Sequence, residues 1–151
     1  MSRYPDLIRP VWVEIDLDSI RHNLAEIRRL IGPTVELMAV VKAEAYGHGA
    51  VKVAQTALQS GAHRLGVALP EEGVALRKAG ITAPILVFSP LQTDQAEIMV
   101  RFDLTPTICM LEPAVALSRA AASAGKEIPF QVKIDTGMNR IGIPANEGII
   151  F

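Results

Sequence analysis

The feature that most constrains the fold is a regular alternation of apolar, strand-like runs with helix-like stretches. The strand-like runs lie near 35–41, 65–69, 85–88, 107–111 and 130–134. Between them come helix-like stretches at 50–60, 71–79, 94–101 and 113–124. Strands that are apolar throughout are typical of a parallel sheet whose faces are covered by helices. The alternation therefore predicts an α/β fold made of parallel β/α units.

Two architectures repeat such units, the doubly wound sheet and the TIM-type (β/α)8 barrel. No G-x-G-x-x-G sequence opens a helix after a strand, which disfavours a dinucleotide-binding doubly wound sheet. We therefore expect the first part of a barrel. A complete barrel needs ~200–250 residues, and this chain has 151. The barrel is predicted to be incomplete, so that its edge strands need further chain or a partner.

A separate segment precedes the repeating units, which begin at about residue 34. Alternating apolar and acidic positions at 11–16 predict a lead-in strand within residues 1–17. Asp18 or Ser19 is expected to cap a following helix, which the pair Gly32-Pro33 would end.

Composition and charge exclude several classes of protein. Half of the residues are apolar and the formal net charge is −1, which indicates a globular domain without a nucleic-acid footprint. No segment approaches the ~18 apolar residues needed to span a membrane, so a cytoplasmic protein without a membrane partner is expected. Cys109 is the only cysteine, which excludes an internal disulfide and suggests a packed thiol.

The first candidate site is the stretch 39–49, which reads A-V-V-K-A-E-A-Y-G-H-G. An apolar run delivers Lys42 into a loop bounded by glycines that also carries Tyr46 and His48. A desolvated lysine loses its proton more readily and can react with an aldehyde. The alternative is a surface lysine after an ordinary strand, beside a tyrosine with a satisfied hydroxyl. His48 either supports Lys42 or bonds to the backbone.

The second candidate site is the stretch 133–142, which reads K-I-D-T-G-M-N-R-I-G. It also follows an apolar run and enters a glycine-rich loop. Active sites of barrels are built at the carboxyl ends of the strands, so Lys133 and Arg140 are expected at the same end of the sheet as Lys42. Without further context, Arg140 would be a surface arginine and Lys133 a strand-end lysine that reaches solvent. No paired histidines or cysteines suggest a metal site.

Both stretches resemble motifs of the alanine racemase family, which reads A-V-V-K-A-N-A-Y-G-H-G and K-x-D-T-G-M-x-R-x-G. Residues 12–17 also resemble the family's opening W-x-E-I-D-L. The resemblance covers essentially the whole chain. It implies that residues 1–151 form the N-terminal portion of the family's barrel domain, with the C-terminal β domain absent.

The resemblance also implies a role for each candidate residue. Lys42 would bind pyridoxal 5′-phosphate covalently and act as one of two bases at the substrate Cα. Tyr46 would donate its hydroxyl to the cofactor phosphate. Arg140 would contact the phenolic oxygen of the cofactor and help to hold the substrate carboxylate. Lys133 would be carbamylated and would hold Arg140, because a carbamate replaces a cation with an anion.

The implied function is interconversion of L- and D-alanine by a homodimer, supplying D-alanine for cell-wall peptidoglycan. The family's second base is a tyrosine from the later domain of the other subunit, and the arginine at the pyridine nitrogen also lies later. The chain alone is therefore expected to be inactive. The alternatives are a non-catalytic truncated or split half that associates with a partner or itself, a racemase of broader amino-acid specificity, and a cofactor-carrying barrel of related fold.

Two acidic positions need separate interpretation. Glu44 stands where the family has asparagine; its added charge is predicted to weaken cofactor binding or to favour the protonated form of Lys42, and it makes strict alanine specificity doubtful. Glu71 and Glu72 fit the first turn of a helix, where the helix dipole favours carboxylates, and are not predicted to be catalytic.

Overall fold

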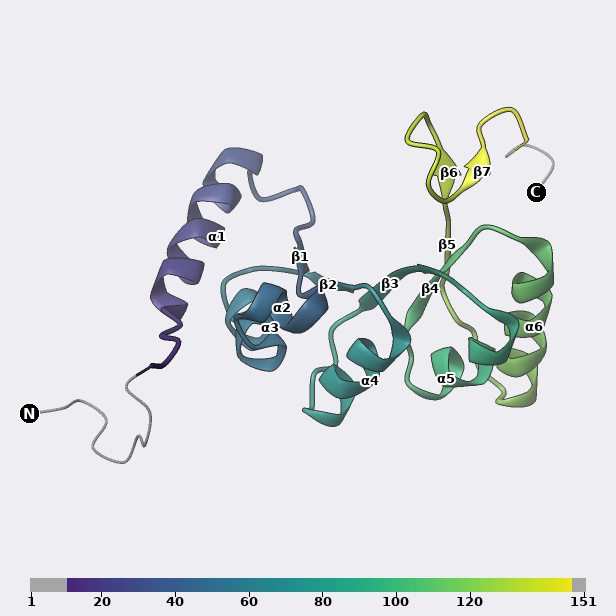
Figure 1. Cartoon of the computed structure of the whole chain (residues 1–151), viewed down its shortest axis with the longest axis horizontal. Coiled ribbons are helices and arrows are strands. Elements are labelled where there is room, and N and C mark those ends of the chain that lie inside the picture. The colour runs from purple at the N-terminus through teal and green to yellow at the C-terminus, as the bar shows by residue number, and fades with distance from the viewer. Residues whose placement is uncertain (1–10, 148–151) are drawn as a thin grey trace, which may run out of the picture.

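The computed structural model describes residues 11–147, which form helices around a parallel sheet (Figure 1). The described elements, in chain order, are α1 Leu17–Ile31, β1 Met38–Val40, α2 Lys42–Gly47, α3 Ala50–Gln59, β2 Arg64–Val67, α4 Pro70–Lys78, β3 Ile85–Pro90, the 3-10 helix η1 Thr93–Gln95, α5 Ala96–Arg101, β4 Thr105–Ile108, α6 Leu111–Ser123, β5 Gln131–Val132, β6 Ile134–Asp135 and β7 Ile143–Pro144. Within this part of the chain, no helix combines the length and apolar character needed to cross a membrane.

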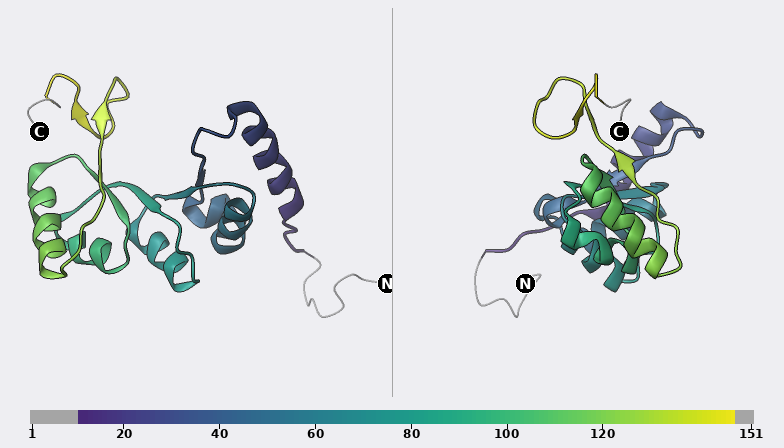
Figure 2. Two further views of the ribbon diagram at one scale, coloured as in Figure 1. Left: turned by 180° about the vertical axis from the view of Figure 1, so that it is seen from behind. Right: turned by 90° about the vertical axis from the view of Figure 1, so that its right-hand side faces the viewer.

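The main sheet has five strands in the order β1-β2-β3-β4-β5, and every neighbouring pair is parallel. Helices α4, α5 and α6 lie along one side of it (Figures 1 and 2). The side chains buried between these layers are almost entirely aliphatic, and the largest include Leu65, Leu76, Ile85, Leu91, Met99, Leu104 and Ile108. The predicted α/β fold of parallel units is confirmed.

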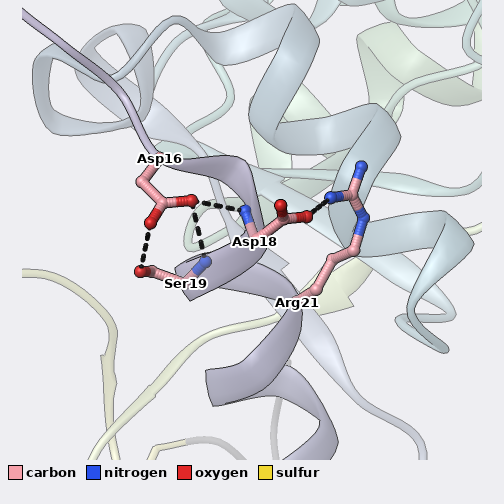
Figure 3. A network of polar contacts seen from close by, with 4 residues as sticks. All are labelled: Asp16, Asp18, Ser19 and Arg21. Atoms are coloured by element: carbon pink, nitrogen blue, oxygen red, sulfur yellow. Dashed lines mark hydrogen bonds and ion pairs between the residues drawn. The ribbon is translucent and has the colours of Figure 1, made fainter.

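Helix α1 begins with a dense network of polar contacts around Asp16 (Figure 3). The Asp16 carboxylate accepts bonds from the amides of Asp18 at 2.8 Å and Ser19 at 3.2 Å, and from the Ser19 hydroxyl at 2.8 Å. These bonds, led by that of the Ser19 hydroxyl, lower the pKa of Asp16. Arg21 pairs with Asp18. The prediction that Asp18 or Ser19 caps the helix was wrong, because the extended backbone of Asp16 places its carboxylate over their amides.

The lead-in strand expected in residues 1–17 is absent from its described part. Residues 11–16 form no strand, and Leu17 is already helical. The side chains of Val11 and Val13 are 80% and 81% exposed. An alternating pattern needs a neighbouring strand to become a sheet, and none in the described residues pairs with this segment. Residues 1–10 lie outside the described residues.

Several of the predicted strand boundaries were also wrong; β1, for example, begins at Met38 rather than near residue 35. The run at 107–111 was predicted as a strand, but β4 ends at Ile108 and α6 begins at Leu111, because Pro113 suits the first turn of a helix. The run at 130–134 divides at Lys133. Its amide donates to Ile108 O of the main sheet at 3.0 Å, whereas its carbonyl accepts from Ile143 at 2.8 Å.

Cys109 is half-buried, and burial raises the pKa of its thiol.

Arg77 at the end of α4 connects two loops on the amino-terminal side of the sheet. Its guanidinium donates to Ile81 O at 2.8 Å and Ala83 O at 2.7 Å, before β3. It also donates to Phe102 O and Asp103 O, each at 2.9 Å, before β4. Burial lowers the pKa of Arg77, and the charge of Asp103 opposes this effect. The planar fork of arginine matches this set of carbonyls in a way that lysine cannot.

Replacing this guanidinium is expected to destabilise the fold. Arg77→Met should lower the free energy of unfolding by about 2–3 kcal/mol, because carbonyls of two loops lose a charged donor. The neighbouring exposed Lys78 provides the matched control, and Lys78→Met should change stability by less than about 0.5 kcal/mol. Urea unfolding followed by circular dichroism measures both. Equal midpoints for the two variants would contradict the prediction.

Candidate functional site

Lys42 lies at the carboxyl end of β1, where the strand passes directly into α2. Val41 is 1% exposed and its amide donates to Gly66 O of β2 at 2.8 Å, so the chain is held to the sheet up to the lysine. Lys42 itself is half-buried. This placement is the one predicted for a lysine delivered by an apolar run to the active-site end of a barrel strand.

The segment after Lys42, predicted as a loop bounded by glycines, is a left-handed turn. Ala43, Glu44, Ala45 and Tyr46 have φ values of 49°, 55°, 51° and 55°. For residues with a side chain, this conformation costs roughly 1–2 kcal/mol per residue. Part of the cost is offset by the bonds from the Ala45 amide to Val41 O at 3.0 Å and from Gly49 N to Glu44 O at 2.8 Å. Strained backbone segments cluster at functional sites, and this one directly follows Lys42.

The left-handed turn brings Tyr46 back over Lys42. The Lys42 Nζ lies 5.8 Å from the centroid of the Tyr46 ring, and the tyrosine is 62% exposed. Of the two possibilities for His48, the structure supports a backbone contact, because its Nδ1 lies 2.9 Å from Ala45 O. Lys42 and Tyr46 thus share one face of the turn, while His48 stabilises its end.

Glu44 faces the beginning of α3. Its Oε2 accepts a hydrogen bond from the Ala50 amide at 3.2 Å, at the first residue of that helix. The partial positive charge of a helix N-terminus favours a carboxylate there. Asparagine, the residue of the family pattern, enters the left-handed region more easily than glutamate does. Glu44 is therefore less suited to its own backbone conformation, but its side chain accepts a bond at the start of the next helix.

The second stretch forms the loop 136–142, which joins the parallel strands β6 and β7. Asp135 Oδ1 accepts from the Gly137 amide at 2.9 Å. Amide donors, first that of Gly137 and then that of Asn139, lower the pKa of Asp135, so its carboxylate stays ionised at neutral pH. Lys133 is exposed and its Nζ lies 3.2 Å from Ile134 O. Arg140 is exposed, and no hydrogen bond or ion pair within residues 11–147 links it to Lys42 or Lys133.

The two stretches lie at the same end of the strands but at opposite edges of the sheet. Lys42 follows β1 and Arg140 comes after β5, and both strands belong to one parallel sheet. At ~4.8 Å per neighbouring strand, β1 and β5 are roughly 19 Å apart along the sheet. Figure 1 shows α2 and the β6–β7 pair well separated. The structure therefore brings Lys42 and Tyr46 together, but leaves Lys133 and Arg140 apart from them.

Glu72 is a residue of this site whose role the sequence did not reveal. Its Oε1 accepts from the Ala43 amide at 2.6 Å, next to Lys42. Its Oε2 accepts from the amides of Ala68 at 2.6 Å and Leu69 at 3.1 Å. Glu72 lies in the first turn of α4, as the sequence predicted, and the bond from the Leu69 amide closes the start of that helix. The bond to Ala43, 29 positions away, has no local sequence signal.

Gly142, the last residue of the loop 136–142, lies close to the backbone of Asp135. Its φ is +124°, and an added Cβ would lie 2.8 Å from the Asp135 amide nitrogen. Gly137 has a φ of +137° but open space around it. Gly142→Ala is therefore expected to cost about 2–3 kcal/mol and Gly137→Ala about 1–2 kcal/mol, because only the first adds a steric clash to backbone strain. Thermal unfolding of both variants tests the order, and a more damaging Gly137→Ala would contradict it.

The arrangement defines a class of protein: a partial β/α barrel with a lysine at the carboxyl end of its first strand. Comparison with known proteins gives the family. Residues 15–149 match the family model described as "Alanine racemase, N-terminal domain". This chain belongs to the alanine racemase family, as the motifs indicated.

Individual relatives agree. The alanine racemase of Halothermothrix orenii is 43% identical over 145 residues, covering 96% of this chain and 38% of the relative. That of Synechocystis is 48% identical over 134 residues, covering 88% and 36%. The solved alanine racemase of Clostridium difficile 630 is 39% identical with a TM-score of 0.90, covering 95% of this chain and 37% of that one. The chain thus spans less than two fifths of the length of these relatives.

Proposed function

We propose that this chain forms the cofactor-anchoring part of an alanine racemase that uses pyridoxal 5′-phosphate. The observation that carries the proposal is Lys42, half-buried at the carboxyl end of β1, with Tyr46 folded back over it by the left-handed turn. Membership of the alanine racemase family supports the substrate, alanine. The D-alanine formed would serve cell-wall peptidoglycan.

The described residues fit the cofactor chemically. Lys42 supplies a primary amine for an aldehyde, and the exposed Tyr46 supplies a hydroxyl for a phosphate oxygen. Arg140 and Lys133, both exposed, supply cations in the second stretch. When bound, pyridoxal phosphate supplies an electron sink that acidifies the Cα–H bond of an amino acid.

The residues of the chain then have distinct tasks. Lys42 holds the cofactor and moves a proton at one face of the substrate Cα. Tyr46 orients the phosphate end. Arg140 helps to hold the substrate carboxylate, for which a planar guanidinium is well suited. Lys133 holds Arg140 if carbamylated, because its own charge would otherwise repel that of the arginine.

A partner completes the site in this proposal. The residues described here include one base, whereas racemisation needs a second proton carrier on the opposite face. A homodimer would supply it from a later domain of the other subunit. The chain's span of 38% of the Halothermothrix relative is consistent with a longer parent protein. If this chain instead acts as a split half, the same residues would pair with a separately encoded partner.

The experiment that tests the proposal is covalent trapping. The test uses the intact protein, by which we mean this chain together with the later domain or separate partner that the proposal assigns to it. It is incubated with pyridoxal phosphate, reduced with borohydride and digested, and its peptides are mapped. The label is expected on Lys42 alone, with conversion of L-alanine to D-alanine measured on the same preparation. Label on Lys52 or another lysine would refute the assignment, and turnover of other amino acids at a similar rate would indicate a racemase of broader specificity.

A further inference from the structure

Glu72 connects the lysine segment to the neighbouring β/α unit. Its two carboxylate oxygens bind different segments of the chain. Oε1 accepts from the Ala43 amide, and Oε2 accepts from the amides of Ala68 and Leu69. The last two residues join β2 to α4. The carboxylate therefore fixes the beginning of the left-handed turn to the carboxyl end of the adjacent strand.

A carboxylate suits this arrangement better than a carboxamide does. Three amide hydrogens converge on Glu72 from two segments, with donor–acceptor distances of 2.6, 2.6 and 3.1 Å. A carboxylate is an acceptor at both oxygens, whereas a carboxamide accepts at one end and donates at the other. Bonds from amides to an ionised acceptor are also stronger than bonds between neutral groups.

Glu72 and the first two residues of the turn line one pocket. Glu72 is half-buried and lines a pocket of about 230 Å³ together with Val41, Ala43, Glu44, Ala50, Val51, Val67, Ala75 and Leu76. These residues come from β1, β2, α2, α3 and α4 or from the residues beside them. Glu44, the residue after Ala43 in the turn, accepts from the Ala50 amide at 3.2 Å. Two carboxylates, those of Glu72 and Glu44, thus tie the first two residues of the turn to neighbouring helices.

We propose that Glu72 is a positioning residue for Lys42, acting through the Ala43 amide and through the left-handed turn that carries Tyr46. The proposal rests on the proposed function, because it concerns how the cofactor-binding lysine is presented. Without the carboxylate, the Ala43 amide loses its acceptor and the strained turn is free to relax. Lys42 then keeps its chemistry but spends less time in the reactive orientation, so the reaction slows with little change in substrate affinity.

The test compares Glu72→Gln and Glu72→Asp with Glu71→Gln in the intact protein. Glutamine keeps the shape but loses one acceptor oxygen, and aspartate keeps the charge but loses reach. Glu71 is the exposed neighbour in the same helix turn and has no hydrogen bond or ion pair in the described part of the chain. Hydrogen–deuterium exchange on the cofactor-free protein reports the turn directly, and uptake of pyridoxal phosphate with alanine kinetics reports its consequence.

Exchange at residues 43–46 is expected to be about tenfold faster in both Glu72 variants than in Glu71→Gln, as for a lost bond to a charged acceptor. Attachment of pyridoxal phosphate to Lys42 and kcat should fall by about tenfold, with KM for alanine nearly unchanged. Thermal unfolding checks that each variant is folded, and Glu72→Asp remains informative if Glu72→Gln is not.

Three results would overturn the proposal. The first is exchange at residues 43–46 equal to that of Glu71→Gln. The second is faster exchange with unchanged cofactor attachment and kcat, which would make the contact purely structural. The third is normal behaviour of Glu72→Asp beside an impaired Glu72→Gln, because charge alone would then suffice. Wild-type protein that takes up no pyridoxal phosphate would instead contradict the proposed function. Exchange in the two Glu72 variants would then show by itself whether Glu72 holds the turn.

Discussion

Lys42→Ala is expected to lower the rate of alanine racemisation by the intact protein by about 10³-fold or more. The lysine is proposed both as the covalent anchor of the cofactor and as the proton carrier on one face of the substrate. Its removal takes away both roles at once. The effects on rate of losing two roles that act together are not additive, so the loss is given as a single value. The fold should survive, because Lys42 is half-buried beyond the last residue of β1 and packs over an exposed ring.

Two further variants separate the roles of Lys42 from its charge. Lys42→Arg keeps a positive charge at this position. A guanidinium stays protonated at neutral pH and so cannot accept the substrate proton or react with the aldehyde, and this variant should be as inactive as the alanine variant. Lys52→Ala removes an exposed lysine of α3 and should retain wild-type activity. A small primary amine added to Lys42→Ala should restore part of the proton transfer. The measurement is D-alanine formation, and activity of Lys42→Ala above one tenth of wild type would contradict the assignment.

The 151-residue chain alone is expected to show no racemase turnover with added pyridoxal phosphate. One proposed base cannot both remove a proton from one face and deliver it to the other. An open arc of strands also leaves the cofactor in water, which weakens the preorganised environment on which this chemistry depends. Conversion of L-alanine to D-alanine measures turnover. A rate comparable to that of a full-length alanine racemase, from a monomer, would contradict the prediction.

The same chain is expected to self-associate through its sheet edges. In the described residues, β1 pairs only with β2 and β5 pairs in the main sheet only with β4, so each has one unpaired side. Val132→Lys places a charge on β5 at a residue that is already 40% exposed, and charged edges oppose strand pairing. Light scattering should give a higher average mass for the wild-type chain than for this variant. Equal monomeric masses would show that the edges are protected in another way.

Much of the fold could be predicted from the sequence because its signals are local. Helix α3 was expected at 50–60 and is observed at Ala50–Gln59, and the β3 strand was expected at 85–88 and is observed at Ile85–Pro90. In both cases apolar periodicity and the neighbouring turn residues agree. Where a pattern depended on a partner, as at 11–16, the same reasoning failed, because alternation does not say whether another strand lies beside it.

The candidate site divides in the same way. The two motifs predicted that the candidate residues follow strands, and the structure agrees. Lys42 and Tyr46 come after β1, and Lys133 and Arg140 come after β5. The left-handed turn at 43–46 could not be foreseen, since alanine, glutamate and tyrosine have no preference for positive φ. Local backbone bonds and the bond from the Ala43 amide to the distant Glu72 offset part of its cost.

The sequence by itself determined the succession of strands and helices, the family and the identity of the candidate residues. Each of these depends on residues close together in the chain. Tertiary structure alone decided that Glu72 contacts Ala43 and that Arg140 lies four strands from Lys42. Both follow from the parallel order of the sheet, which places neighbouring units side by side and the first and fifth strands at opposite edges.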